Sequence, residues 1–313
     1  MNNKNRKFID LFAGIGGMRI PFEEQGLKCV FTSEIDKFSR KTYEAFFGDI
    51  PSGDITLIPP ENIPKFDILL AGFPCQPFSQ AGLRKGLSDK RGGMFSVIKD
   101  ILDYHKPTAF LLENVRGLSN HDNKKTLRRI YEELEALNYH VTSEILAAKD
   151  FNLPQIRERI YIVGFKKKAA KKRFEFPKPI KLTKKLRKIL EKNPDPKYTI
   201  SDRLWIGHQE RKKRKKKRGV GFGYRLFDRT EDYVNTISAR YYKDGSEILI
   251  KQENKNPRKI TPIEAARIQG FPDKIVKMAR KSDISDTQLY RQFGNAVPVN
   301  VVREICKKIL EAL

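Results

Sequence analysis

The feature that most constrains the fold is an alternation of short apolar runs with amphipathic stretches between residues 7 and 165. Runs such as 66–72 and 108–115 are nearly all apolar, which is typical of parallel strands covered by helices on both faces. The expected strands are 8–12, 28–33, 66–72, 108–115 and 159–165, and the expected helices between them are 18–25, 37–47, 94–104 and 124–137. This pattern predicts an α/β fold with a doubly wound, mostly parallel sheet.

A change in composition after residue 165 predicts a second, smaller domain. The basic segment 166–173 and the NPDP turn at 193–196 interrupt the strand and helix pattern. We expect a first domain over 1–180, completed by 276–313, and a β-containing domain over 181–275. The last segment should contain a helix over 299–310. Within the second domain, Asp244-Gly245 is the expected turn of a hairpin over 236–250.

The charge of the chain points to a polyanionic partner. The 63 Lys and Arg residues exceed the 38 Asp and Glu residues, so the formal charge is +25 and the isoelectric point about 9.9. Binding of Lys and Arg to phosphates releases the counterions condensed on nucleic acid. A general preference for lysine in the source proteome is the alternative explanation.

Composition also excludes several classes of protein. At 39% hydrophobic and 32% charged residues, the chain is expected to be globular, without extensive disorder. It has no signal-peptide pattern and no run of eighteen uncharged apolar residues, so we expect a cytoplasmic protein without membrane attachment. Three scattered cysteines and four histidines without ligand spacing indicate neither a disulfide framework nor a metal site.

A glycine-rich loop follows the first expected strand. The segment 13–17 (AGIGG) places backbone amides and a helix N-terminus at the carboxyl edge of the sheet. The dinucleotide fingerprint would need a third glycine at position 19, where the chain has Arg19, so a nicotinamide or flavin cofactor is disfavoured. Glu34, about twenty residues later, could accept hydrogen bonds from ribose hydroxyls. The alternative is that these glycines only form a tight turn.

Three other strand ends carry reactive groups. Cys75 lies between Pro74 and Pro77 after the 66–72 strand, and Glu113 ends the 108–115 strand at the same expected edge. Arg157 and Arg159 lie beside that edge, where guanidinium groups could bind phosphate or a carbonyl oxygen. Taken singly, a buried inert thiol, a helix-capping glutamate and solvated arginines are the competing interpretations.

Six ordered blocks of the sequence resemble the cytosine-5 DNA methyltransferase family, in its bacterial restriction-modification and Dcm-type members. The resemblance extends from Phe8 nearly to the C-terminus. The blocks are FIDLFAGIGG (8–17), GFPCQPFS (72–79), ENV (113–115), QIRERIYIVGF (155–165), RKITPIEAARIQGFP (258–272) and QFGNAVPV (292–299).

The resemblance implies that S-adenosylmethionine is the cofactor, with S-adenosylhomocysteine as product and no metal. The first domain would then be the catalytic, cofactor-binding domain. Glu34 would hold the ribose, Asp54 would accept a bond from the adenine amino group, and the last block would close the pocket. The implied cofactor-binding residues are Phe12, Gly14, Gly16, Glu34, Ile35, Asp54, Ile55, Pro74, Asn295 and Val297.

The resemblance also implies a mechanism. The Cys75 thiolate would add to C6 of cytosine while Glu113 supplies a proton to N3, and C5 would then take the methyl group. Arg159 would contact cytosine O2, and Arg157 and Asn114 would organise the pocket or contact the DNA backbone. Because C6 is inaccessible within the stacked duplex, the target cytosine would have to be flipped out.

The second domain would recognise the sequence around the flipped base. Segments 221–224 and 239–250 resemble the target-recognising part of Dcm-type enzymes, which implies a CCWGG-, CCNGG- or CCGG-like site. The basic octet 211–218 fits phosphate contact or a flexible loop better than base readout. We expect a monomer that acts on double-stranded DNA in the cytoplasm, associated with the nucleoid of a bacterial or phage-like host.

Two other functions remain open at this point. A tRNA cytosine-5 methyltransferase would share the catalytic blocks, but the Cys-Phe-Thr signature of RNA-acting members needs a cysteine between Cys75 and Cys306, and the chain has none there. A catalytically silent DNA-binding protein would not require Cys75, Glu113, Arg157 and Arg159 together.

Overall fold

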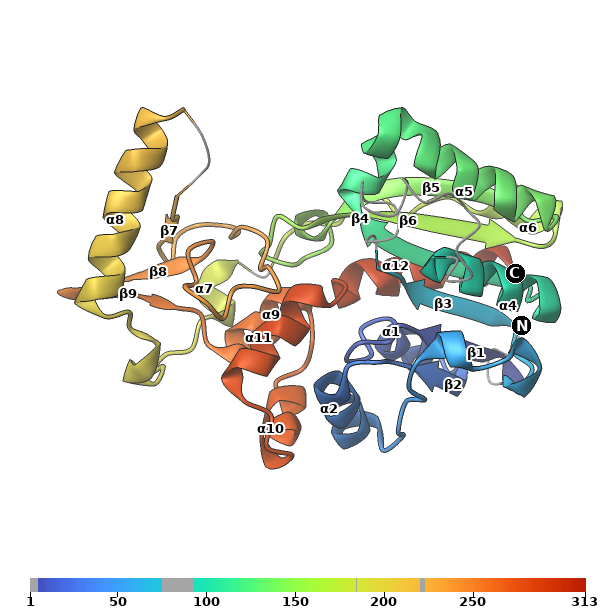
Figure 1. Cartoon of the computed structure of the whole chain (residues 1–313), viewed down its shortest axis with the longest axis horizontal. Helices are drawn as coiled ribbons and strands as arrows, with labels where there is room; N and C mark the ends of the chain where they lie inside the picture. Colours follow the sequence, from blue (N-terminus) through green and yellow to red (C-terminus); the bar gives the residue numbers. More distant parts are fainter. Residues whose placement is uncertain (1–4, 75–92, 184, 220–222) are drawn as a thin grey trace. The chain divides into compact units, whose positions relative to one another are not determined.

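The computed structural model describes residues 5–74, 93–183, 185–219 and 223–313 (Figure 1). Contacts divide the chain into two units. The first comprises Met1–Ala147, Glu158–Pro179 and Val301–Leu313, and the second comprises Ala148–Arg157 and Ile180–Asn300. Residues 276–300, which we expected to complete the first domain, are grouped by their contacts with the second unit.

The first unit is built on a six-stranded sheet with the order β2-β1-β3-β4-β6-β5. Strands β1 to β4 run parallel, and only β6 is reversed, because it pairs antiparallel with both β4 and β5. The bounds are β1 Lys7–Leu11, β2 Lys28–Ser33, β3 Ile68–Gly72, β4 Ala109–Val115, β5 His140–Ala147 and β6 Glu158–Phe165. The predicted α/β fold with a mostly parallel sheet is confirmed.

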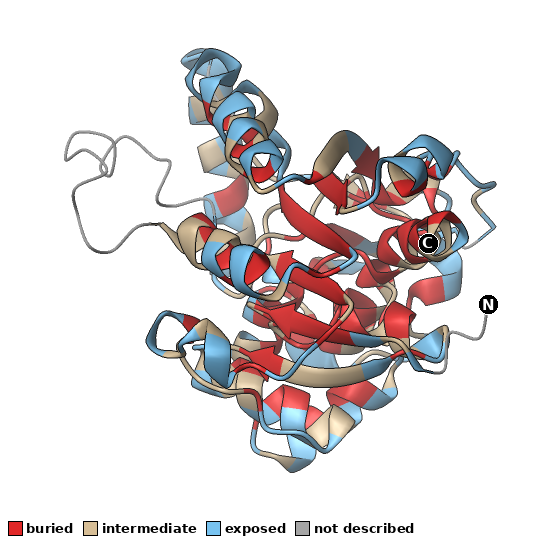
Figure 2. Cartoon of the chain, turned by 90° about the vertical axis from the view of Figure 1, so that its right-hand side faces the viewer, coloured by how far each residue is buried: buried red, intermediate tan, exposed pale blue. Residues whose placement is uncertain are grey.

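Helices cover both faces of this sheet. Their bounds are α1 Arg19–Glu24, α2 Lys37–Phe47, α4 Met94–His105, α5 Lys125–Ala136, α6 Lys168–Arg173 and α12 Val299–Ala312. Ile98 of α4 and Leu134 of α5 share one core with Leu69 and Leu112 of the sheet. On the other face, Phe8 of β1 packs on Phe22 of α1 with ring centroids 5.6 Å apart. Figure 2 shows the result, with β1, β3, β4 and β6 mostly buried and the helices buried on one side.

Local sequence explains where these helices begin and end. Asp36 caps α2 by accepting a hydrogen bond from the Ser39 amide, and Gly48 ends the helix at φ 80°. Short 3-10 turns connect other elements; they are η2 Ile55–Leu57, η3 Pro60–Asn62, η5 Arg116–Lys124, η6 Ala148–Asp150 and η7 Pro196–Tyr198. Among the described residues, no helix is both long and apolar enough to cross a membrane.

In the part of the chain that the structure describes, the second unit combines a small sheet with the helices α7 to α11. Strand β8 pairs in parallel with β7 and antiparallel with β9. The bounds are β7 Leu226–Phe227, β8 Leu249–Gln252, β9 Lys255–Lys259, α7 Leu186–Ile189, α8 Asp202–Lys217, α9 Pro262–Gln269, α10 Lys274–Lys281 and α11 Asp286–Asn295. A buried, bidentate pair of Arg258 with Glu264, at 2.7 and 2.8 Å, ties β9 to α9.

The predicted hairpin over 236–250 is wrong. The chain does turn at Asp244-Gly245, but Ser238–Lys243 form successive turns, with the Tyr241 amide bonded to Ser238 O and the Gly245 amide to Tyr241 O. Tyr241 is fully buried, and its hydroxyl donates to Ile248 O and accepts from the Ile260 amide. This burial of Tyr241 fixes a compact loop, and the hairpin forms instead between β8 and β9.

Candidate active site

The glycine loop leaves β1 through left-handed backbone conformations. Phe12, Gly14 and Gly16 have φ values of 54°, 56° and 81°. A Cβ atom on Gly16 would lie 2.2 Å from the ring of Phe47, so α2 can approach the loop only because residue 16 is glycine. Position 14 faces open space, where a Cβ atom would meet no other atom within 4 Å. The loop is therefore both tightly packed at Gly16 and open at Gly14, as a ligand cradle requires.

Glu34 is held against this loop by two backbone amides. Its Oε2 accepts from the Gly14 amide at 2.8 Å, and its Oε1 accepts from the Asp36 amide at 2.7 Å. Burial raises the pKa of Glu34, and the two amide bonds oppose that rise by favouring the carboxylate. The next side chain, Ile35, is 70% exposed. The carboxylate is thus preorganised beside Gly14, with an apolar side chain available next to it.

Asp54 is brought to the same edge by a short bridge to β2. Ser52 pairs with Ser33, and the Glu34 amide donates to Ser52 O at 2.8 Å. Asp54 then caps the η2 turn, because its Oδ1 accepts from the amide and the hydroxyl of Thr56. Ile55 is buried directly behind it. The structure thereby brings Glu34, Ile35, Asp54 and Ile55 together around the end of β2.

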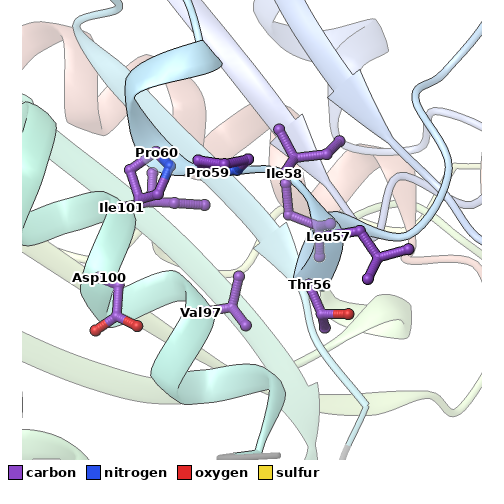
Figure 3. Close-up of a pocket in the computed structure, with 9 residues that line it drawn as sticks. Thr56, Leu57, Ile58, Pro59, Pro60, Val97, Asp100 and Ile101 are labelled. Atoms are coloured by element: carbon purple, nitrogen blue, oxygen red, sulfur yellow. The ribbon is translucent and has the colours of Figure 1, made fainter.

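A pocket that sequence reasoning did not identify adjoins Asp54. It has a volume of about 220 Å³ and is lined mainly by apolar side chains (Figure 3). Its residues come from the η2–η3 segment and from α4; they are Ile55, Thr56, Leu57, Ile58, Pro59, Pro60, Val97, Asp100 and Ile101. Ile55 and Thr56 line this pocket and also belong to the group of residues around Asp54, since Thr56 donates to Asp54. The pocket therefore adjoins the residues at the end of β2.

The ends of β3 and β4 form a second group of candidate residues. Gly72 pairs with Glu113, and the Asn114 side chain donates from Nδ2 to Phe73 O at 2.9 Å. This bond fixes the backbone immediately before Pro74, which is exposed. Cys75 lies outside the described residues. Asn114 therefore positions the segment that leads toward the expected nucleophile.

Glu113 and Arg159 form a close ion pair. Arg159 Nε lies 3.0 Å from Glu113 Oε1, and Glu113 is 8% exposed. The pairing of Val115 with Arg159 in the β4–β6 register brings the two side chains together. Arg159 also donates to Glu158 O at 2.8 Å. The sequence placed both groups at one edge, and the structure adds their direct contact.

Arg157 has a different set of contacts. It belongs to the second unit, is 1% exposed and donates to three carbonyl oxygens, at 3.2 Å to Ile237, 3.1 Å to Gly294 and 2.8 Å to Ala296. Asn295, exposed at the end of α11, and the buried Val297 flank the carbonyls that Arg157 binds. Arg157 therefore fixes the backbone around these two residues.

Arg19 has a structural role that the sequence pattern did not reveal. Its guanidinium lies 4.3 Å from the centroid of the Phe47 ring, 2.7 Å from Glu23 and 2.5 Å from Asp49. It thus joins α1 to the end of α2 beneath the glycine loop. Next to it, burial raises the pKa of Asp10 well above the ordinary value for aspartate.

The two cysteines that the structure describes are poor nucleophiles. Burial raises the pKa of Cys29 to about 12 and raises that of the fully buried Cys306 as well. Within residues 5–74, 93–183, 185–219 and 223–313, no group of three or more His, Cys, Asp or Glu side chains could hold a metal ion.

Comparisons with known proteins agree with this arrangement. Residues 6–311 match the family described as C-5 cytosine-specific DNA methylase. The chain is 58% identical to the type II methyltransferase M.DsaV of Dactylococcopsis salina, over 99% of this chain and 87% of that protein. It is 54% identical to M1.ScrFI of Lactococcus lactis subsp. cremoris, over 100% and 80%. The Dnmt2 methyltransferase of S. pombe shares the fold, with a TM-score of 0.79, 21% identity and coverage of 98% and 99%.

The fold and these strand ends define an α/β enzyme with a cofactor loop at the carboxyl edge of its sheet. The chain belongs to the C-5 cytosine-specific DNA methylase family. It is a DNA (cytosine-5-)-methyltransferase related to the methyltransferases of type II restriction-modification systems, and its family uses S-adenosylmethionine and acts on DNA.

Proposed function

We propose that this enzyme modifies cytosine within a short duplex site and that the residues around β1, β2, β3 and β4 do the chemistry. The ion pair of Glu113 with Arg159 carries this proposal, because it presents a carboxyl group and a guanidinium next to the backbone that leads to Cys75. A family resemblance alone would not predict that these two side chains touch.

The residues at the end of β2 fit S-adenosylmethionine. Glu34 has both oxygens fixed by amides and can accept bonds from ribose hydroxyls, while Asp54 has one oxygen committed to Thr56 and can direct the other to an amino group. Phe12, Gly14 and Gly16 would cradle the cofactor. Ile35, Ile55 and Pro74 would contact its apolar surfaces, and Asn295 and Val297 would close the pocket. When bound, S-adenosylmethionine supplies an electrophilic methyl group.

The chain then activates the cytosine. The Cys75 thiolate forms a bond to C6, Glu113 delivers a proton to N3, and the resulting enamine is nucleophilic at C5. C5 takes the methyl group as the methyl–sulfur bond of the donor breaks, which leaves S-adenosylhomocysteine. A base then removes the C5 proton, the C6–sulfur bond breaks to return the thiolate, and N3 returns its proton to Glu113. Arg159 binds cytosine O2, Asn114 holds the backbone at Phe73, and Arg157 positions the backbone at 294–296. No metal takes part.

Specificity is assigned to the second unit, because the flipped base alone cannot report the surrounding sequence. The proposed target begins with CC and ends with GG, the enzyme acts as a monomer in the cytoplasm, and its biological role is modification within a restriction-modification system. Bisulfite sequencing of DNA treated with the purified protein tests the target. Methylation confined to CC…GG contexts supports it, and marks in other contexts contradict it.

The substrate class is tested with tritiated methyl donor. The proposal predicts transfer to duplex DNA and none to total tRNA. Transfer to tRNA instead would favour the RNA methyltransferase alternative, and transfer to neither would favour a silent DNA-binding protein.

A further inference from the structure

The basic octet 211–218 forms the end of an anchored helix. Helix α8 extends from Asp202 to Lys217, and Arg218 follows it (Figure 1). The eight cations of the octet are consecutive, and the two acidic residues of α8, Asp202 and Glu210, precede them. The octet covers about 12 Å of helix axis at about 1.5 Å per residue, a length over which duplex DNA carries about seven phosphate charges.

One face of α8 is bound to the rest of the second unit. His208 is buried; its Nε2 lies 3.1 Å from Asp244 O, and Arg211 donates to its Nδ1 at 2.7 Å. Burial lowers the pKa of His208, which agrees with a neutral ring that donates at one nitrogen and accepts at the other. Arg211 also pairs with Asp244 at 2.9 Å. This contact fixes the rotation of the helix about its axis.

Aromatic contacts add to this anchor. The rings of Trp205 and Tyr224 are 4.8 Å apart, and Lys212 Nζ lies 4.5 Å from the centroid of the Tyr224 ring. Arg211 and Lys212 are therefore used to hold the helix. Residues 213–218 make no side-chain hydrogen bond or ion pair with any residue that the structure describes, and Lys213, Arg214 and Lys217 are exposed.

We propose that the exposed face of α8 around Lys213, Arg214 and Lys217 binds the phosphate backbone of duplex DNA. At 100° per residue, these three side chains lie on one side of the helix, opposite His208. Like charges at adjacent positions repel each other, and a polyanion relieves that repulsion. Lys presents a mobile point charge suited to phosphate, whereas base readout needs fixed, directional donors. The inference rests on the proposed action on DNA and identifies which element supplies its sequence-independent affinity.

The salt dependence of binding tests this proposal. For the full-length protein with Lys213→Gln, Arg214→Gln and Lys217→Gln, we expect the slope of log Kobs against log salt to fall by about 2.7, at about 0.9 per phosphate contact. Between 50 and 200 mM salt, the variant should then lose about 40-fold less affinity than the wild type. The ratio of cognate to non-cognate affinity and kcat at saturating DNA should not change.

The matched control removes the same charge elsewhere. Lys167→Gln, Lys168→Gln and Lys172→Gln alter exposed residues at and in α6 of the first unit, and the salt slope should stay unchanged. An equal fall in slope in this control would show that only net charge matters and would overturn the proposal. A wild-type salt slope in the α8 variant would also overturn the proposal. This holds even if the free energy of unfolding of the variant changes, because the three cations would then only stabilise the end of the helix.

A charge-retaining variant separates phosphate contact from base readout. Lys213→Arg, Arg214→Lys and Lys217→Arg should keep both the slope and the sequence preference, whereas a changed preference would assign α8 to base recognition and contradict the proposal. Methylation by the wild type is measured independently, so absence of methyl transfer would refute the proposed function, and methyl transfer with an unaffected salt slope would refute only this inference.

Discussion

Arg159 Nε lies 3.0 Å from Oε1 of Glu113, between neighbouring antiparallel strands of the first unit. A planar guanidinium beside a mostly buried carboxyl group restricts the positions that either can adopt. The pair therefore gives a defined location for the groups that would bind N3 and O2 of one cytosine.

Replacement of Glu113 should damage catalysis and leave folding nearly intact. Glu113→Gln keeps the shape of the side chain but removes the transferable proton, so kcat/KM should fall by about 10²- to 10⁴-fold. DNA affinity and the urea midpoint should change little. The matched control is Glu158→Gln, which breaks an exposed ion pair with Arg116 (2.6 Å), and its kcat should remain that of the wild type. Full activity in Glu113→Gln would refute the role of this carboxyl group.

Substitution of Arg157 should mainly reduce stability, whereas substitution of Arg159 should mainly reduce turnover. In Arg157→Lys, a single amino group replaces the guanidinium that donates to three carbonyl oxygens. Because some of these buried oxygens would lose their donor, we expect the free energy of unfolding to fall by about 2–4 kcal/mol. Arg159→Lys keeps a positive charge beside Glu113, so it should lower the free energy of unfolding less than Arg157→Lys does but reduce kcat strongly. Urea unfolding and single-turnover methylation measure the two effects. An unstable Arg159→Lys beside a stable Arg157→Lys would contradict the assignment.

The glycines of the loop should differ in their tolerance of a methyl group. Gly16→Ala introduces a Cβ atom 2.2 Å from Phe47 and also places alanine at a positive φ. Gly14→Ala places alanine at a positive φ without any steric clash. Gly16→Ala should therefore destabilise the protein by about 1–3 kcal/mol more than Gly14→Ala. Gly14→Ala should instead mainly weaken S-adenosylmethionine binding, as measured by calorimetry. Equal unfolding energies would show that Phe47 does not constrain the loop.

Glu34 should make cofactor affinity dependent on pH. Because burial raises its pKa, Glu34 should protonate above the ordinary value of about 4.3, and the Kd for S-adenosylmethionine should rise as pH falls through that raised pKa. Glu34→Gln should bind about 10- to 100-fold more weakly and lack this pH dependence.

The stability of the cofactor-free protein should show the opposite trend. A raised folded-state pKa contributes stability that is present below the unfolded pKa and is lost as pH rises through the folded pKa. The wild type should therefore lose stability relative to Glu34→Gln over this window as pH rises. Glu61→Gln, a change at an exposed glutamate of the same unit, provides the control and should show neither trend. A Kd independent of pH would contradict the role of Glu34.

Much of the fold could be predicted because it depends on local patterns. Strong apolar runs located five of the six strands of the main sheet, and a capping aspartate with a terminal glycine marks α2. Strand β5 was missed because His140–Ala147 mixes apolar with polar residues and is only partly buried, so it lacks the continuous apolar run of the central strands. The reversed direction of β6 depends on pairing between strands, which hydrophobic periodicity does not encode.

The candidate site divides in the same way. Glu34 could be proposed from its place after a strand and Asp54 from the family resemblance, whereas the contact of Glu113 with Arg159 follows from the β4–β6 register. The burial of Arg157 was not predictable from the QIRER motif, because strand β6 begins only at Glu158 and residue 157 enters a different set of contacts. The turn at Asp244-Gly245 was correctly identified. Whether a strand or a compact loop precedes it depends on the tertiary contacts of Tyr241, which the local sequence does not encode.

Covalent trapping tests the account most directly. Duplex DNA with 5-fluorocytosine at the preferred site should form a denaturation-stable complex with the protein in the presence of S-adenosylmethionine, because fluorine at C5 prevents the final proton removal. Peptide mapping should place the bond on Cys75, and Cys75→Ala should form no complex. A wild-type protein that methylates ordinary DNA but is never trapped, or a complex that persists in Cys75→Ala, would contradict attack by this cysteine on C6.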